Sequence, residues 1–196
     1  MSSIIRVNPE SVRQYARQAQ SNFETIRAEL DRLVKSVAEV RYLGENAFVF
    51  KTGISELSVE FANKFSHDLA AIADHIRVLT SNIAGSLGGQ PITIEVKGGT
   101  ITAPAIQKSD VVDVDTTELA ALTGVVTRHF GVLTDNLDQH LRALEATDWV
   151  GQAKDSVSQD VRQYTQKLRN NCDEVSGQIT KSINDQVAAA RQADRG

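Results

Sequence analysis

The sequence is poor in cysteine, proline and aromatic residues. It has one cysteine, three prolines and 5% aromatic residues among its 196 residues. The lone Cys172 excludes an intrachain disulfide and any metal site built from several thiolates. Few prolines and few aromatic residues favour long helices over sheets that are rich in turns. The fold is therefore expected to be all-α.

Long apolar runs are also missing. No run approaches the roughly 20 residues that cross a bilayer, so stable membrane insertion is not expected. The first six residues, Met-Ser-Ser-Ile-Ile-Arg, lack the apolar core of a signal peptide. If the protein is exported, it needs a route that does not use a cleavable signal peptide.

Charge and residue spacing exclude further classes of function. The net charge is −4, so no basic surface points to nucleic acid. The four histidines, at 67, 75, 129 and 140, do not form the i, i+4 pair of a helical metal site. No other group of residues has the spacing of a catalytic centre. We therefore expect no enzyme, no cofactor and no metal.

Apolar residues recur every three or four positions in four long stretches, which predicts four helices. Asn8 is the expected N-cap of the first helix, with Pro9 at its first position. That helix breaks at residues 41–46, and the second fades near residues 85–89. Asp115 or Thr116 caps the third helix, which stops near residue 148, and a fourth helix follows.

The second half of the chain repeats the first with an offset of 107 residues. Val7 corresponds to Val114, Phe23 to Phe130 and Ile26 to Leu133. The break between helices repeats as well, because Tyr42-Leu43-Gly44 corresponds to Trp149-Val150-Gly151. A shared register across two helices and their turn indicates a duplicated helical hairpin.

Each hairpin has one apolar stripe and needs a partner face to bury it. The neighbouring half of the chain is the obvious partner. The prediction is an all-α four-helix bundle from one chain, with a first hairpin at 1–88, a linker at 89–111 and a second hairpin at 112–196. Whether the halves pair within one chain or swap between two stays open at this point.

The linker has a pattern of its own. Apolar residues alternate with polar ones before Gly98-Gly99, which predicts a β-hairpin at 92–103, and an extended segment is the alternative. The apolar residues of this ribbon are Ile92, Ile94, Val96 and Ile101. They can pack along the bundle, or the open edge of the ribbon can pair with a neighbouring chain and build an oligomer.

The two aromatic-x-Gly turns are the candidate site. Their residues are Tyr42, Leu43 and Gly44 in the first hairpin, and Trp149, Val150 and Gly151 in the second. In one interpretation the aromatic rings only fix the bend between helices. In the other, the turns and the helix residues beside them form a surface that binds a protein partner.

Long paired helices around Trp149-Val150-Gly151 resemble the WXG family, the helical-hairpin substrates of type VII secretion systems. The resemblance covers residues 112–192 well and residues 5–86 more weakly, because Tyr42 replaces the tryptophan. It implies two hairpins that associate into a four-helix bundle, here fused in one chain. The chain departs from the family in lacking a C-terminal Tyr-x-x-x-Asp/Glu signal, since Tyr164 is followed four residues later by Leu168.

The resemblance also implies a function. The expected protein is a secreted substrate, or an export partner or chaperone, of a type VII secretion system. Its partners would be the secretion ATPase or an effector or toxin. It would lie in the cytoplasm before export, and then outside the cell or at its surface. The alternative is a structural protein that assembles into a ring, tube or layer of identical chains.

Overall fold

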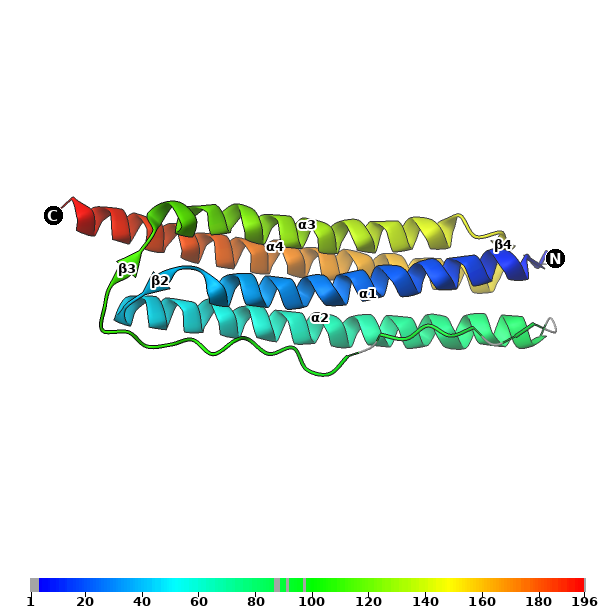
Figure 1. The fold of residues 1–196 in the computed structure, drawn as a ribbon. Coiled ribbons are helices and arrows are strands. Elements are labelled where there is room, and N and C mark those ends of the chain that lie inside the picture. Colours follow the sequence, from blue (N-terminus) through cyan, green and yellow to red (C-terminus); the bar gives the residue numbers. More distant parts are fainter. Residues whose placement is uncertain (1–3, 87–88, 91, 97, 196) are drawn as a thin grey trace. The chain divides into compact units, whose positions relative to one another are not determined.

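The structure is a computed structural model that describes residues 4–86, 89–90, 92–96 and 98–195. Within these residues it has four long helices (Figure 1). They are α1 (Pro9–Glu39), α2 (Glu45–Ser86), α3 (Thr116–Glu145) and α4 (Gln152–Asp194). The predicted all-α four-helix fold is confirmed. In the described part of the chain, none of these helices has the length and hydropathy that crossing a membrane requires.

Four strands of two residues each join the helical hairpins. They are β1 (Arg6–Val7), β2 (Tyr42–Leu43), β3 (Asp113–Val114) and β4 (Trp149–Val150). β1 pairs antiparallel with β4, and β2 pairs antiparallel with β3. Each turn between helices is thus paired with the segment that enters the first helix of the other repeat.

The chain forms two compact units, and every helix contributes to both. Unit 1 contains residues 1–27, 65–98 and 134–169, and unit 2 contains residues 28–64, 99–133 and 170–196. The sequence therefore repeats hairpin by hairpin, whereas each compact unit contains segments of both hairpins. Adding or subtracting 107 converts most of unit 1 into unit 2.

In unit 1, all four helices contribute apolar side chains to one core. Phe23, Phe65, Leu69, Leu137 and Leu168 each expose 2% of their surface or less. Burial of a large apolar side chain contributes roughly 1.5–3 kcal/mol. The apolar stripes that the sequence predicts are thus the faces that meet in this core.

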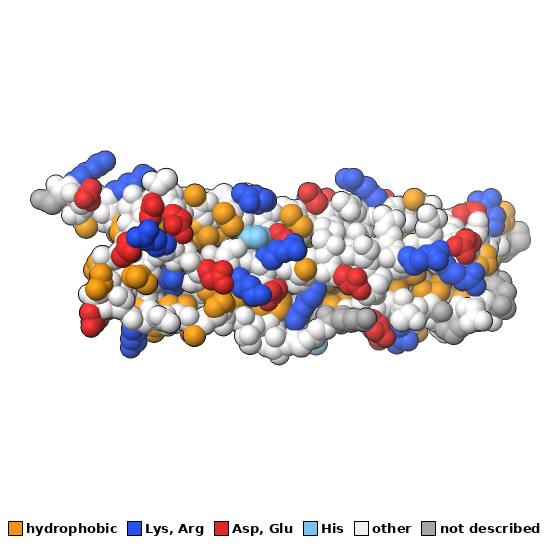
Figure 2. All heavy atoms as spheres, viewed as in Figure 1, with side chains coloured by type: hydrophobic (Ala, Val, Ile, Leu, Met, Phe, Trp, Pro, Cys, Tyr) orange, Lys and Arg blue, Asp and Glu red, His pale blue; other side chains and the backbone are white. Residues whose placement is uncertain are grey.

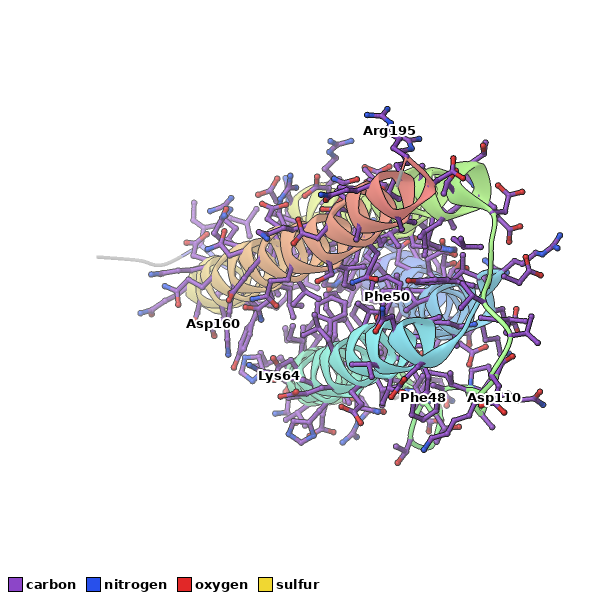
Figure 3. All side chains as sticks on the ribbon, turned by 90° about the vertical axis from the view of Figure 1, so that its left-hand side faces the viewer. Phe48, Phe50, Lys64, Asp110, Asp160 and Arg195 are labelled. Atoms are coloured by element: carbon purple, nitrogen blue, oxygen red, sulfur yellow. The ribbon has the colours of Figure 1, made fainter. Side chains whose placement is uncertain are left out.

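In unit 2, the core is built from the repeat-equivalent positions and others beside them. Phe61 and Phe130 meet with ring centroids 5.1 Å apart. Viewed from the end where β2 and β3 lie, Phe50 points inward among the helices while Phe48 points toward the linker (Figure 3). The Lys108 ammonium lies over the Phe48 ring, 4.9 Å from its centroid.

The first helix of each repeat begins with the same capping device. The Asn8 side-chain oxygen accepts from the backbone N–H groups of Glu10 and Ser11 at 3.1 and 3.4 Å. Asp115, the equivalent of Asn8, accepts from Thr117 and Glu118 at 2.9 and 3.0 Å. Both caps satisfy backbone donors that a helix start leaves free, which confirms the predicted cap at Asn8.

The linker is an extended segment, which is one of its two predicted forms. No strand falls in the described part of 92–103, and Lys97 lies outside the described residues. Several backbone groups of this segment bond to helix side chains. In unit 1, Gln20 accepts from Glu95 N at 2.7 Å. In unit 2, Asn63 bonds to both Ile101 N and Ile101 O, at 2.8 and 2.9 Å.

Most apolar residues of the ribbon are buried. Ile92, Ile94 and Ile101 are buried at 7%, 2% and 3% exposure, and Val96 is half-buried. Of the two roles predicted for this ribbon, this burial favours packing along the helices over an oligomerisation edge. The alternating pattern reflects side chains that point alternately to the helices and to solvent.

This position of the linker predicts a stability effect for Ile94→Ala. Because Ile94 is almost fully buried, the substitution should lower the free energy of unfolding by about 2–4 kcal/mol. Thr93→Ala, at an exposed neighbouring position, is the control and should cost less than about 0.5 kcal/mol. Urea unfolding measures both. Equal effects of the two substitutions would contradict the buried linker.

Candidate functional site

The two aromatic-x-Gly turns are equivalent in structure as well as in sequence. Trp149 is the Cα partner of Val7, and Tyr42 is the Cα partner of Val114. Val114 is the repeat equivalent of Val7, and Trp149 is the repeat equivalent of Tyr42. Both pairs therefore join the same two positions of the repeat, each time across the two halves of the chain. Backbone contacts follow the same rule. Asp148 N donates to Ser11 Oγ at 2.9 Å, and its equivalent Arg41 N donates to Glu118 Oε1 at 3.2 Å.

Each turn also carries an ion pair between the repeats, with the charges exchanged. In unit 1, Arg6 lies 2.8 Å from Asp148. In unit 2, the equivalent positions are Asp113 and Arg41, which lie 3.0 Å apart. A turn paired with the entry segment of its own repeat would bring Arg6 toward Arg41, or Asp113 toward Asp148. The charge pattern therefore favours pairing of unlike repeats over like ones.

Both the backbone conformation and the packing of each turn favour glycine at its third position. Gly44 and Gly151 have φ angles of +122° and +142°, which residues with a side chain rarely adopt. An ideal Cβ on Gly44 would lie 3.3 Å from Val112 Cγ2, and one on Gly151 would lie 3.7 Å from Ile5 Cγ1. Ile5 and Val112 are repeat equivalents, so in both turns the residue before the entry strand lies close to the turn glycine.

A buried lysine holds the end of the preceding helix at each turn. Lys51 Nζ donates to Val40 O at 2.8 Å, and Lys154 Nζ donates to Thr147 O at 3.1 Å. Burial lowers the pKa of both lysines. Lysine caps of this kind satisfy carbonyl groups that a helix end leaves free. They come from different positions of the repeat, so the offset alone does not reveal them.

The aromatic rings of the two turns differ in their surroundings. Tyr42, 8% exposed, donates its hydroxyl hydrogen to Gln186 Oε1 at 3.1 Å and packs on Phe50. Trp149, 4% exposed, lies instead beside a cavity of about 500 Å³. The cavity is lined by β1, the last turns of α2 and the start of α4, with Val7, Leu79 and Ile83 among its apolar residues. The indole N–H has no hydrogen-bond partner among the described residues.

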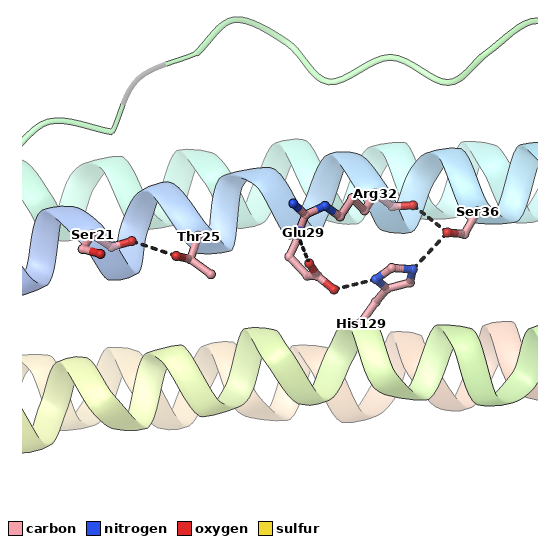
Figure 4. Close-up of polar contacts among 6 residues, drawn as sticks. All are labelled: Ser21, Thr25, Glu29, Arg32, Ser36 and His129. Atoms are coloured by element: carbon pink, nitrogen blue, oxygen red, sulfur yellow. Dashed lines mark hydrogen bonds and ion pairs between the residues drawn. The ribbon is translucent and has the colours of Figure 1, made fainter.

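A second polar feature, in unit 2, joins α1 to α3 (Figure 4). His129 Nδ1 lies 2.6 Å from Glu29 Oε1, and His129 Nε2 lies 2.9 Å from Ser36 Oγ. Desolvation opposes ionisation of Glu29, but hydrogen bonds and charge from His129 and Arg32 outweigh it and lower the Glu29 pKa. Sequence reasoning missed this cluster because its members lie about 100 residues apart, on two helices.

The order serine, histidine and carboxylate resembles a nucleophile with its base. The surroundings do not suit acyl transfer. The Ser36 hydroxyl donates to Arg32 O at 2.8 Å, and the backbone N–H groups around it are used within α1. A reaction of this type needs free donors for the oxyanion. We interpret the cluster as a polar contact that fixes α1 against α3. Among the residues described, no three His, Cys, Asp or Glu side chains are grouped to hold a metal.

Unit 1 has a buried polar pair of a different kind. Tyr15 Oη and His140 Nε2 lie 2.8 Å apart, and the Phe23 ring packs on His140 with centroids 4.8 Å apart. Burial lowers the pKa of His140 to about 4 and raises the pKa of Tyr15. The equivalents in unit 2, Leu33 and Leu122, are apolar.

Comparisons of this chain with protein-family models, with curated proteins and with solved structures find no match. The candidate site therefore has to be assessed on its own geometry. That geometry brings Tyr42, Leu43 and Gly44 together with β3, and Trp149, Val150 and Gly151 together with β1. It leaves the ribbon residues out of the site.

The buried histidine predicts a loss of stability in mild acid. The folded state disfavours protonated His140, whose pKa lies below its ordinary value of 6.5. Its contribution is therefore complete above pH 6.5 and is lost as the pH falls toward 4. By pH 4.5 the free energy of unfolding should fall by about 2–3 kcal/mol. Chemical unfolding at several pH values measures the slope.

The control variant replaces the polar pair by apolar residues of similar shape. His140→Leu with Tyr15→Phe should remove most of the slope between pH 6.5 and 4.5. His67→Leu, at an exposed position of α2, should leave the slope intact. A slope that survives in the double variant would assign the pH dependence to other groups.

Proposed function

We propose that the chain is a non-enzymatic, WXG-like protein that serves as a secreted substrate or as an export partner of a type VII secretion system. It acts through contacts between helices. The reciprocal pairing of the two turns carries this proposal. In each unit, the turn of one hairpin is paired with the entry segment of the other, as expected where two hairpins associate. One half of the chain acts as the partner of the other.

The cavity beside Trp149 supports recognition of a further protein at this turn. Its walls are mostly apolar, and the indole N–H is a donor without a partner among the described residues. An apolar side chain with a nearby carbonyl oxygen would fit both features. In unit 2, the Tyr42 hydroxyl already bonds to Gln186. Recognition is therefore assigned to Trp149 rather than to Tyr42.

The sequence adds a reason to look at this turn. The second hairpin lacks the Tyr-x-x-x-Asp/Glu signal, because Leu168 follows Tyr164 at the fourth position. We infer that selection by a secretion ATPase, or pairing with an effector or toxin, uses the turn at Trp149. The proposed protein is made in the cytoplasm and is then exported.

A matched pair of substitutions tests the role of Trp149. Trp149→Phe keeps an aromatic ring and removes the indole N–H, and Tyr42→Phe removes the hydroxyl at the equivalent position. Tyr42→Phe should lower the free energy of unfolding by about 1 kcal/mol because it removes the hydrogen bond to Gln186. Trp149→Phe should cost about as much, because the buried indole is replaced by a smaller ring. Export should fall about tenfold for Trp149→Phe, because one lost hydrogen bond of about 1.4 kcal/mol changes affinity by that factor. It should stay near wild type for Tyr42→Phe.

The measurement is the fraction of chain found outside cells that carry an active secretion ATPase, compared with cells whose ATPase is inactivated. Export of the wild-type chain in the absence of ATPase activity would contradict the proposed route. Equal export of both variants would show that the rings only fix the turns.

A further inference from the structure

The exposed apolar residues of this chain are not scattered at random over the repeat. Nine large apolar side chains are well exposed in the described residues, and six of them form three repeat-equivalent pairs. The pairs are Ile4 with Val111, Ile5 with Val112, and Leu43 with Val150. Ile4, Ile5, Val111 and Val112 are each at least 67% exposed. The other three, Val49, Val78 and Tyr164, have no exposed apolar equivalent.

In each set, two residues directly precede the entry strand and the third lies in the turn strand that pairs with it. We name Ile4, Ile5 and Val150 cap 1, and Val111, Val112 and Leu43 cap 2. In cap 1, Val150 is the Cα partner of Arg6, which follows Ile5 directly. In cap 2, Leu43 is the Cα partner of Asp113, which follows Val112 directly. Figure 2 shows hydrophobic side chains at the surface beside β2 and β3, where cap 2 lies.

The folding of each unit does not account for these residues. The turns are held by strand pairs, ion pairs, helix caps and buried lysines, and none of these interactions uses a cap side chain. Ile4, Ile5, Val111 and Val112 keep about two thirds or more of their surface in water in the single chain. Contiguous exposed apolar groups usually mark a surface that another molecule covers. Their presence at the same three positions of both repeats indicates such a surface on each unit.

The charges around the two caps differ in sign. Cap 1 is flanked by residues 4–17 and 148–152, which contain three arginines and two acidic residues, a net charge of +1. Cap 2 is flanked by residues 111–124 and 41–45, which contain one arginine and four acidic residues, a net charge of −3. Figure 2 shows basic side chains gathered over the N-terminal part of α1, beside cap 1.

We propose that cap 1 of one copy binds cap 2 of a second copy, so that the chains associate head to tail. The apolar residues of both caps become buried, and the basic surroundings of one face the acidic surroundings of the other. Because every copy carries one cap of each kind, the contact is heterologous and can continue from chain to chain. This assembly does not depend on the proposed export, and it uses surfaces other than the ribbon at 92–103.

Two variants, each with one damaged cap, test the proposal. Val150→Asp places a charge in cap 1, and Val112→Asp places one in cap 2. The wild-type chain should form species larger than a dimer as its concentration rises in sedimentation velocity runs. Each variant alone should stay monomeric, with association weakened about 100-fold by burial of an unpaired charge. An equimolar mixture should form a dimer and stop there, because one intact cap of each kind remains.

Val78→Asp is the matched control for Val150→Asp. Val78 and Val150 lie in the same unit and are 43% and 45% exposed, but the repeat equivalent of Val78 is Asp185. This control should associate like the wild type. Circular dichroism and thermal unfolding verify that all variants are folded.

Three results would overturn the proposal. The first is a wild-type chain that stays monomeric at all concentrations. This is also the result expected if the caps serve only to bind a different protein. The second is a Val150→Asp variant that dimerises alone, which would indicate that like caps bind each other. The third is a mixture of the two cap variants that shows no dimer.

Discussion

The one-sided apolar stripe of each hairpin is the constraint on which this structure depends. A hairpin alone would leave that stripe in water, and here the other half of the same chain covers it. The two short strand pairs determine which ends meet, because each joins a turn to the entry segment of the opposite repeat. The ion pairs at these ladders, with their charges exchanged, favour the same arrangement.

Polar groups inside the two units refine this arrangement. Glu29 and His129 join α1 to α3 in unit 2, and the equivalent positions in unit 1 are the buried Asn136 and Asn22. Both units thus have polar side chains at the same repeat positions of α1 and α3. The Glu29–His129 pair can fix the register of α1 on α3, since a shift would leave both side chains without partners.

The helices, the repeat and the turns could be predicted from the sequence, because apolar periodicity and an aromatic-x-Gly element are local patterns. The linker could not be assigned, since the alternation around Ile92 and Ile94 is the same for a hairpin and for an extended chain that packs on helices. The contacts of His129 and His140 needed the tertiary structure, because their partners lie 100 and 125 residues away. The cavity at Trp149 also depends on residues of four elements, β1, α2, β4 and α4.

Cysteine cross-linking tests the reciprocal pairing most directly, in a chain whose buried Cys172 is replaced by alanine. Arg6→Cys with Val150→Cys, and Leu43→Cys with Asp113→Cys, place thiols at Cα partners of the two ladders. Both pairs should form disulfides within single chains, whereas Arg6→Cys with Leu43→Cys should not. Disulfides that form only between chains, or an equal yield for the third pair, would contradict the account.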